Sequence, residues 1–310
     1  TTGDIVDKWD NGNDWFVGII NAIDINMRYR QYAKPGAWND PDMFVIGNGG
    51  CTTEEYRTQF SMWAMMAAPL IAGNDLRTMD EVTREILTNK EVIAVNQDPL
   101  GIQCIKVRDD GDQEVYVKPL ANGDYAVALL NRGVSAAKIR VTAEEIGFSA
   151  KPESGYLVRD LWQHSEFGSL GEIEADVPMH GTVMYRASQV PVEQLPGYVE
   201  INLSAEQSVS AEAHFEFAVN LVNSGAKDVV NVMISLQVPD GWLAEGLTDS
   251  GFNQLAVGDS IAAKWNISPS LAADGFSDIV VTVAYQDELG EREWQKGFRV
   301  LVLPPEAVFT

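Results

Sequence analysis

Apolar residues in the first hundred positions recur at steps of three and four, which is typical of helices that bury one face. Such a stripe predicts a helix over residues 14–32, closed by the turn-forming Lys34-Pro35-Gly36. Thr52 and Glu55 have the spacing of a capping box, which predicts the start of a second helix that ends before Pro69. The stripe of the first helix consists of Phe16, Ile19, Ile20, Ile23 and Met27.

Two further elements follow Pro69. Leu70-Ile71-Ala72 predicts a short buried strand, and a second capping box from Thr78 to Glu81 predicts a helix that runs through Leu87. Alternating helices and buried strands are typical of an α/β architecture, so we assign residues 1–101 to an α/β domain.

The apolar period changes to two beyond the α/β domain. Short alternating runs without intervening helices, with a hairpin signal at Asn122-Gly123, predict an antiparallel β-sandwich over residues 102–188. Residues 189–197 contain two prolines and a glycine, and we interpret them as a linker that blocks strand pairing. A second, immunoglobulin-like β-sandwich is predicted over residues 198–304, followed by a tail at 305–310.

The charge balance narrows the function classes. The 310 residues include 22 Lys+Arg against 45 Asp+Glu, a formal net charge of −23 at pH 7. Such a field repels phosphate backbones and anionic lipids, which excludes nucleic-acid binding and attachment to a membrane surface, and no apolar run is long enough to predict a membrane span. Nearly half of the excess, −11, falls after residue 195 and therefore concerns the solubility of the last domain.

The cysteines and two of the tryptophans are interpreted as structural. Cys51 and Cys104 allow at most one disulfide, which leaves the compartment open, and neither has a neighbouring His pattern, so we expect small buried side chains. Trp242 and Trp265 could form a platform for sugar rings, but core tryptophans are commoner in sandwiches, and we expect them in the core.

The remaining motifs predict neither a cofactor nor a metal. His164, His180 and His214 lack the spacing of metal ligands and are interpreted as structural. Asp109-Asp110-Gly111-Asp112 resembles half a calcium loop without its closing Glu, so we expect a solvated turn. Residues 47–50 are glycine-rich but lack the Lys-Ser/Thr pair of a phosphate loop.

Two dense polar segments are candidates for catalysis. Asp4 lies in a turn of small residues where a strand would end, and Trp38-Asn39-Asp40-Pro41-Asp42-Met43 lies between two predicted helices. In α/β barrels, catalytic groups occupy the C-terminal ends of strands. Two carboxylates beside an aromatic wall suit glycoside cleavage, because one protonates the leaving oxygen and the other attacks or activates water. Asp and Asn are equally common in ordinary turns and caps, so spacing alone leaves both interpretations open.

Residues 1–101 also carry an ordered series of longer motifs. They are Thr1-Thr2-Gly3-Asp4-Ile5, Trp38-Asn39-Asp40-Pro41-Asp42-Met43, Gly47-Asn48-Gly49-Gly50, Thr52-Thr53-Glu54-Glu55-Tyr56-Arg57, Ala68-Pro69-Leu70, Asn74-Asp75-Leu76-Arg77 and Asn96-Gln97-Asp98-Pro99-Leu100-Gly101. This series resembles the α-galactosidases (melibiases) of glycoside hydrolase family 27, over residues 1 to about 188. The region after the linker resembles, more loosely, the NEW3-type domain found beside bacterial α-galactosidases.

The resemblance implies a fold, a reaction and a set of site residues. The fold is a (β/α)8 barrel, of which this chain supplies the last strands only, followed by an antiparallel β-domain, and the reaction is retaining hydrolysis of terminal α-linked galactose. Asp4 matches the family's general acid/base at the end of the sixth barrel strand, and Asp42 and Met43 match the end of the seventh, which lines the galactose pocket. The family's nucleophile lies on the fourth strand, upstream of Thr1, so we expect the chain alone to be inactive on an α-galactoside.

Two kinds of alternative stay open at this point. One is a non-catalytic carbohydrate-binding or interaction module built from the two sandwiches, and the other is an α-N-acetylgalactosaminidase or a β-L-arabinopyranosidase within the same family. We also expect an extracellular or periplasmic protein, because glycosidases that degrade polymers are usually exported and an acidic surface suits that location.

Overall fold

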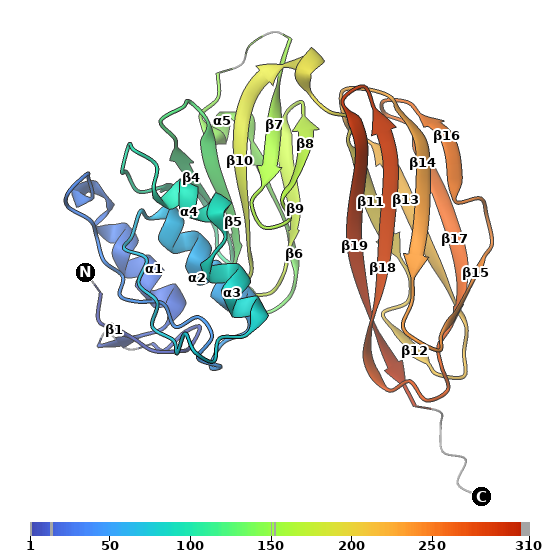
Figure 1. Cartoon of the computed structure of the whole chain (residues 1–310), viewed down its shortest axis with the longest axis horizontal. Helices are drawn as coiled ribbons and strands as arrows, with labels where there is room; N and C mark the ends of the chain where they lie inside the picture. Colours follow the sequence, from blue (N-terminus) through green and yellow to red (C-terminus); the bar gives the residue numbers. More distant parts are fainter. Residues whose placement is uncertain (1, 13–14, 150, 152, 305–310) are drawn as a thin grey trace, which may run out of the picture. The chain divides into compact units, whose positions relative to one another are not determined.

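The computed structural model describes residues 2–12, 15–149, 151 and 153–304. They form two compact units, one made of residues 2–166 with 171–191 and the other of residues 167–170 with 192–304 (Figure 1). Each unit has a hydrophobic core of its own. None of the helices among these residues is long and apolar enough to cross a membrane. The predicted tail at 305–310 lies outside the described residues.

The first unit begins with helices and very short strands. Strand β1 (Asp4–Ile5) pairs in parallel with β2 (Phe16–Val17), and Phe44 forms an isolated parallel bridge with Ala72. The helices are α1 (Ile19–Arg28), the 3-10 helix η1 (Arg30–Tyr32), α2 (Thr53–Met65), α3 (Glu81–Leu87) and α4 (Lys90–Asn96). This confirms the predicted alternation of helices and short strands.

The helix predicted over residues 14–32 is wrong at its start. Residue 14 lies outside the described residues, the next residues form β2, and α1 begins only at Ile19. The helix starts later than predicted because Phe16 and Val17 pair with β1, and this pairing with a distant segment replaces the first helical turn. The backbone N–H of Gly18 donates to Asn21 Oδ1 over 2.9 Å, which fixes the N-terminus of α1 at this point.

Two other local predictions are wrong. Residues 70–72 do not form a buried strand, because only the last of them makes a bridge and Ile71 is 49% exposed. Helix α3 is not capped by Thr78, because the Asp80 carboxylate accepts from the Thr83 backbone N–H over 2.7 Å and takes the N-cap position. Asp80 stands directly before the first helical residue, whereas Thr78 is two residues too early.

The first unit continues as a β-domain, as predicted. Its main sheet has the order β3-β4-β5-β10-β7-β8, and β6 pairs with β9 in a second, two-stranded sheet. Every strand pair given for these sheets is antiparallel. The elements are β3 (Ile105–Asp110), β4 (Gln113–Pro119), β5 (Tyr125–Asn131), β6 (Ala137–Thr142), α5 (Ala143–Ile146), β7 (Ser154–Asp160), β8 (Ser165–Ser169), β9 (Glu172–Val177) and β10 (Thr182–Pro191).

The predicted linker at 189–197 is paired over its first residues. Strand β10 runs to Pro191, which stands opposite Ser154 of β7. Its pairing with β5 ends earlier, at Ala187, so Pro191 has a strand on one side only, and there a missing N–H is tolerated. The 3-10 helix η2 (Val192–Gln194) follows. The expectation that the prolines block pairing is therefore wrong for residues 189–191.

The second unit is a β-sandwich of two sheets. One sheet has the order β11-β13-β17-β15 and the other β12-β19-β18-β14-β16. Along β13 the buried positions alternate with less buried ones, as one face of a sheet against a core requires. The strands are β11 (Val199–Ser204), β12 (Ser208–Ser210), β13 (Phe215–Asn223), β14 (Val229–Gln237), β15 (Leu243–Gly246), β16 (Gly251–Leu255), β17 (Ser260–Ser268), β18 (Gly275–Asp287) and β19 (Gly290–Leu303).

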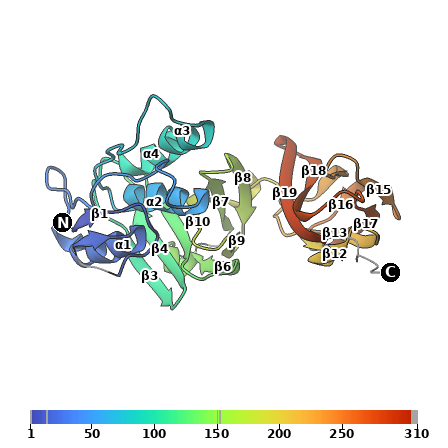
Figure 2. The same ribbon diagram turned by 90° about the horizontal axis from the view of Figure 1, so that it is seen from below.

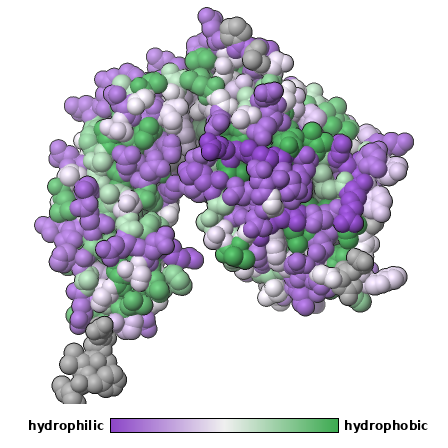
Figure 3. Space-filling model, turned by 180° about the vertical axis from the view of Figure 1, so that it is seen from behind, coloured by the Kyte–Doolittle hydropathy of each residue, from purple (hydrophilic) through white to green (hydrophobic). Residues whose placement is uncertain are grey.

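Helix α2 joins the α/β part of the first unit to its sheet. The predicted capping box is confirmed: Thr52 Oγ1 accepts from the Glu55 backbone N–H over 3.3 Å, and Glu55 Oε2 accepts from the Thr52 N–H over 2.7 Å. Phe60 and Trp63 are buried in the core, and α2 lies against β5 and β10, the second of which is labelled beside α2 in Figure 2. On the face drawn in Figure 3, hydrophilic and hydrophobic residues are interspersed. The buried face of α2 and its packing against β5 and β10 therefore fix the position of the loops around this helix.

Candidate functional site

Asp4 stands on the short strand β1 with its side chain exposed. Its backbone N–H donates to the Trp15 carbonyl over 2.9 Å, and the Val6 N–H donates to the Val17 carbonyl over 2.9 Å. These two bonds hold β1 against β2 on one side. The carboxylate is left free to face solvent or a ligand, as a general acid/base requires.

Asp42 is held on the other side of β1. Its Oδ2 accepts from the backbone N–H of Ile5 over 2.8 Å, and its Oδ1 accepts from the N–H of Met43 over 2.8 Å. Its carbonyl accepts from Trp63 Nε1 over 2.9 Å. The backbone is left-handed, with φ of 77°, a conformation that Asp and Asn adopt more readily than most residues. The structure therefore brings Asp42 next to Ile5, the residue that follows Asp4.

Met43 completes the set of predicted site residues. Its side chain is 43% exposed, and a Cβ added at Gly73 would lie 2.8 Å from Met43 Sδ and 2.3 Å from the Phe44 carbonyl oxygen. The strand-like segment that carries Met43 is aligned by Gln59 of α2, whose Oε1 accepts from the Val45 N–H over 3.1 Å. The glycine at 73 lets the neighbouring chain approach closely while the methionine stays accessible.

Sequence analysis missed Asp7, which fixes the loop after β1. The carboxylate accepts from the Gly50 N–H over 2.5 Å and from the Tyr56 hydroxyl over 3.0 and 3.1 Å. Burial raises the pKa of the Tyr56 hydroxyl, and the hydrogen bond and charge of Asp7 raise it further. Burial also raises the pKa of the Cys51 thiol, with Asp7 adding to the effect, so this thiol is protonated and unreactive at neutral pH. The spacing of three between Asp4 and Asp7 was the available signal.

Trp9 and His180 were also missed as parts of this site. The Trp9 indole stacks on the His180 imidazole, with ring centroids 4.5 Å apart and 10° between the planes. His180 Nδ1 lies 2.7 Å from Glu55 Oε1, in the capping box of α2. His164 makes a similar contact elsewhere, with Nδ1 at 2.6 Å from Glu91 Oε1, and His214 is exposed. Among the described residues, no group of three potential ligands could hold a metal ion.

The other candidates from the sequence have structural places. Trp242 and Trp265 are 7% and 8% exposed in the core of the second unit, which confirms the preferred interpretation. Cys104 is buried, and burial raises the pKa of its thiol to about 12, whereas Cys51 is only half-buried. Of the Asp109–Asp112 segment, Asp109 and Asp110 end strand β3, and Gly111 and Asp112 form the turn to β4, so the expected turn is confirmed for the last two residues only.

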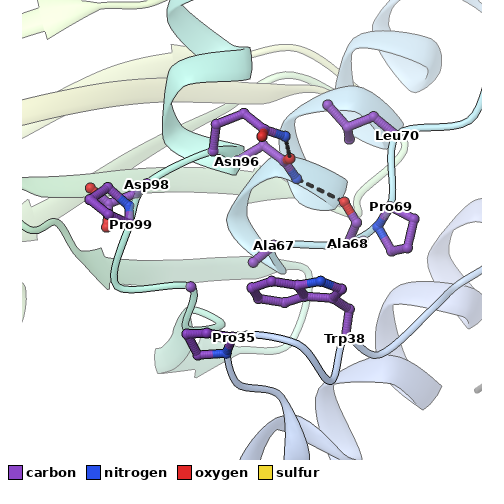
Figure 4. Close-up of a pocket in the computed structure, with 11 residues that line it drawn as sticks. Pro35, Trp38, Ala67, Ala68, Pro69, Leu70, Asn96, Asp98 and Pro99 are labelled. Carbon is purple, nitrogen blue, oxygen red and sulfur yellow. Dashed lines mark hydrogen bonds between the residues drawn. The ribbon is translucent and has the colours of Figure 1, made fainter.

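A pocket of about 480 Å³ lies in the first unit but does not include the predicted site residues. Trp38 lies across it between Pro35 and Ala67 (Figure 4). A Cβ added at Gly101 would lie 2.7 Å from the Trp38 ring, so the glycine packs directly on the indole. Trp38 therefore supports this pocket. The motif of residues 38–43 thus contributes Trp38 to the pocket and Asp42 to the contact with β1. The pocket is lined by Pro35, Trp38, Ala67, Ala68, Pro69, Leu70, Asn96, Gln97, Asp98, Pro99 and Gly101.

Comparison with known sequence families assigns most of the chain to three matches. Residues 1–98 match the family described as Alpha galactosidase A, and residues 110–187 match the Alpha galactosidase C-terminal beta sandwich domain. Residues 209–286 match the NPCBM-associated, NEW3 domain of alpha-galactosidase. The three matches follow one another in the order that the sequence motifs predict.

Individual proteins agree with these matches. The chain is 48% identical to Alpha-galactosidase 2 of Arabidopsis thaliana over 186 residues, which is 60% of this chain and 45% of the relative. It is 46% identical to Alpha-galactosidase A of Cellvibrio japonicus over 204 residues, which is 61% of this chain and 49% of the relative. The chain thus spans about half the length of the curated relatives that it matches.

Solved structures give the same result. The crystal structure of alpha-galactosidase I from Mortierella vinacea matches with a TM-score of 0.57 and 35% identity, covering 60% of this chain and 51% of that one. Alpha-galactosidase from Saccharomyces cerevisiae, solved with raffinose, matches with a TM-score of 0.55 and 25% identity, covering 61% and 58%. The predicted resemblance to the α-galactosidases of glycoside hydrolase family 27 is therefore confirmed over residues 1 to about 188, and that to the NEW3 domain over residues 209–286.

Proposed function

We propose that this chain is the C-terminal part of a retaining α-galactosidase that removes terminal α-linked galactose from oligosaccharides or polysaccharides. The observation that carries the proposal is the hydrogen bond from the Ile5 N–H to Asp42 Oδ2, which joins the two predicted site positions. Sequence identity of 46–48% to α-galactosidases over this region supports the same reaction class.

The same geometry supports a partial (β/α)8 barrel. Three short segments lie side by side. The Asp42 hydrogen bond connects β1 to the segment of residues 42–44. That segment is connected to Ala72 by a parallel bridge and by a 2.8 Å hydrogen bond from the Phe44 N–H to the Ile71 carbonyl. Consecutive parallel strand ends are the pattern of a barrel wall. Trp15, at 81% exposed, and Ile71 are apolar side chains of the kind that further barrel strands would cover.

In this mechanism Asp4 transfers the proton. Its carboxylic acid protonates the glycosidic oxygen while the bond from that oxygen to the anomeric carbon breaks, and its carboxylate then takes a proton from the water that hydrolyses the glycosyl-enzyme intermediate. Retention requires a second carboxylate about 5–5.5 Å away as nucleophile. The resemblance to the family implies that this nucleophile lies on an earlier barrel strand, so we propose that the chain needs that part of the parent protein for activity.

Asp42 and Met43 bind and orient the sugar. Both Asp42 oxygens already accept backbone N–H bonds, but each carboxylate oxygen can accept a second hydrogen bond, and sugar hydroxyls are suitable donors. The exposed Met43 offers an apolar surface to a sugar face. This division leaves the proton transfer to Asp4 alone. We further propose export of the protein to the extracellular space or the periplasm, in keeping with a polymeric substrate and a net charge of −23.

The test compares the chain alone with the chain joined to the preceding part of its parent protein. On an aryl α-galactoside we expect turnover only in the joined form, and loss of that turnover by at least about a hundredfold in Asp4→Asn. Asp110→Asn is the matched control, because Asp110 is an exposed carboxylate at the end of β3, outside the segments that hold Asp4 and Asp42. Turnover by the isolated chain that disappears in Asp4→Asn would refute the need for a partner segment, and an unaffected Asp4→Asn joined form would refute the role of Asp4.

A further inference from the structure

The loop that follows β1, residues 6–10, is held by side chains from two distant parts of the first unit. This Asp4 loop, as we call it, is the direct continuation of the strand that carries the proposed acid/base. Trp9 from the loop stacks on His180, which lies in the turn between β9 and β10 of the β-domain, with centroids 4.5 Å apart and nearly parallel planes. A turn of the β-domain therefore contacts the catalytic end of the α/β part directly.

His180 is itself fixed on three sides. Its Nδ1 lies 2.7 Å from Glu55 Oε1, while the other Glu55 oxygen accepts from the Thr52 N–H over 2.7 Å. The His180 carbonyl accepts from the Thr58 hydroxyl over 2.8 Å. Its φ of 54° is left-handed, a conformation that His adopts more readily than most other non-glycine residues. The imidazole is thus a rigid surface for the Trp9 ring.

The other end of the Asp4 loop is fixed separately. Asp7 accepts from the Gly50 N–H and the Tyr56 hydroxyl, and the carbonyl of Trp9 accepts from the Ile20 N–H over 3.0 Å at the start of α1. Among the described residues, the strand that pairs with β1 is β2, a strand of two residues, and Ile5 adds packing against the core. Two residues of pairing are too few to fix a strand by themselves. The position of Asp4 therefore depends on how firmly its loop is held.

We propose that His180, acting through Trp9, is a positioning residue for Asp4, so that the β-domain sets the geometry of proton transfer in the reaction proposed above. The inference rests on that proposed function. Neither residue touches the reacting atoms. A misplacement of a general acid by about 1 Å is enough to slow a reaction severely, because proton transfer needs heavy atoms within about 2.6–3.2 Å.

Positioning of the acid has a signature that depends on the leaving group. Asp4 gives its proton to the glycosidic oxygen, and an alkyl or sugar leaving group needs that proton because its alkoxide is a strong base. A dinitrophenolate leaves without it. A variant that displaces Asp4 should therefore lose rate on alkyl α-galactosides and keep most of its rate on 2,4-dinitrophenyl α-galactoside. A variant that merely lowers the folded fraction loses the same proportion on both.

The kinetic experiment uses the complete protein, with this chain joined to the preceding part of its parent. In His180→Asn the ring is removed and the left-handed backbone is tolerated. We expect kcat/KM for methyl α-galactoside to fall about tenfold or more, and that for 2,4-dinitrophenyl α-galactoside to change less than about twofold. Trp9→Ala should behave in the same way, and Trp9→Phe, which keeps a ring on His180, should restore most of the alkyl rate.

His164→Asn is the matched control. His164 has the same φ of 54° and a similar Nδ1 contact with a glutamate, Glu91 Oε1, but its partner does not touch the Asp4 loop. We expect it to leave both rates unchanged. Equal losses on both substrates in His180→Asn, or no loss on either, would overturn the proposal. A wild-type protein that cleaves neither galactoside would instead refute the proposed function, so the two failures are distinguishable.

A second measurement needs no activity and uses this chain as it is. Hydrogen exchange of the Ile5, Val6 and Lys8 amides, which bond Asp42, Val17 and the loop itself, reports on β1 and the Asp4 loop. In His180→Asn and in Trp9→Ala we expect these amides to exchange at least about threefold faster, with amides in the middle of α2 unchanged as an internal check of folding. Unchanged exchange at all three amides in both variants would overturn the proposal.

Discussion

At the residue scale, Asp42 must adopt a left-handed backbone conformation and must also accept two hydrogen bonds through its carboxylate. Its φ is 77° and its two oxygens accept N–H bonds from Ile5 and Met43. An asparagine fits the same backbone and can keep one of the bonds through its amide oxygen, whereas an alanine loses both bonds and is strained in this conformation. The two substitutions therefore separate the local fold from the charge.

We expect Asp42→Ala to lower the free energy of unfolding by about 2–4 kcal/mol, and Asp42→Asn by about 1 kcal/mol or less, because the alanine is strained at this φ and removes the acceptor of both the part-buried Ile5 N–H and the exposed Met43 N–H, whereas the asparagine keeps one acceptor. Urea denaturation of this chain followed by circular dichroism measures both. If the two variants lost equal stability, the hydrogen bond to Ile5 would not support the site as described.

Lys118 is a second residue whose environment makes a measurable prediction. It is fully buried, and its Nζ donates to the Ala64 carbonyl over 3.1 Å and to the Val95 carbonyl over 2.8 Å, near the C-terminal ends of α2 and α4. Burial lowers the pKa of Lys118 to about 8. A neutral amine keeps two N–H donors, so both bonds survive deprotonation.

The unfolded state keeps the ordinary pKa of about 10.4 for Lys118, so between pH 8 and 10.4 it binds more protons than the folded state. Stability from this group therefore rises with pH across that window and is flat below it. We expect the urea midpoint of the wild type to rise relative to Lys118→Met from pH 8 to 10. Lys138→Met, which removes a half-exposed lysine, should run parallel to the wild type. A constant difference between wild type and Lys118→Met would contradict the lowered pKa.

The residues of the site were only partly predictable. Asp4, Asp42 and Met43 were proposed from the family resemblance that the ordered motifs carry, because residue type and spacing alone left ordinary turns equally open. Trp9 and His180 lie 171 positions apart, and nothing local to either indicates a stacked pair. Their contact exists only because α2 carries the β9–β10 turn to the end of β1, through Glu55 and Thr58.

At the scale of elements, helix starts show what sequence can and cannot decide. The Thr52–Glu55 box formed as predicted because both partners are local. The start of α1 was misplaced because β2 competes for the same residues through a long-range pairing, and the α3 cap was misplaced because two acceptors, Thr78 and Asp80, stand close together. Local patterns fix an element's existence, and distant partners fix its ends.

The α3 cap gives a direct test at this scale. We expect Asp80→Ala to lower the free energy of unfolding measurably, because the Thr83 N–H loses its acceptor and the negative charge near the helix N-terminus is lost. Thr78→Ala should change it by less than about 0.5 kcal/mol. Chemical denaturation under identical conditions compares them. A larger loss in Thr78→Ala would restore the capping box that the sequence suggested.

At the scale of the whole molecule, each of the two compact units buries apolar residues of its own, and unfolding should reveal both units. Phe60 lies in the cluster between the α/β part and the sheet face of the β-domain that packs on α2, and Phe217 lies in the cluster between the two sheets of the sandwich. Units with separate cores are expected to unfold in separate transitions. Each of these phenylalanines is buried, so replacing it by alanine removes about 3–5 kcal/mol from its own unit.

We therefore expect scanning calorimetry to show two transitions, with Phe60→Ala lowering the temperature of one and Phe217→Ala lowering that of the other. Each variant serves as the control for the other, because Phe60→Ala should leave the transition of the second unit unchanged and Phe217→Ala that of the first. Assignment does not depend on which unit is more stable, because each transition is identified by the variant that moves it. One transition that both variants shift by the same amount would mean that the two cores unfold as a single cooperative unit.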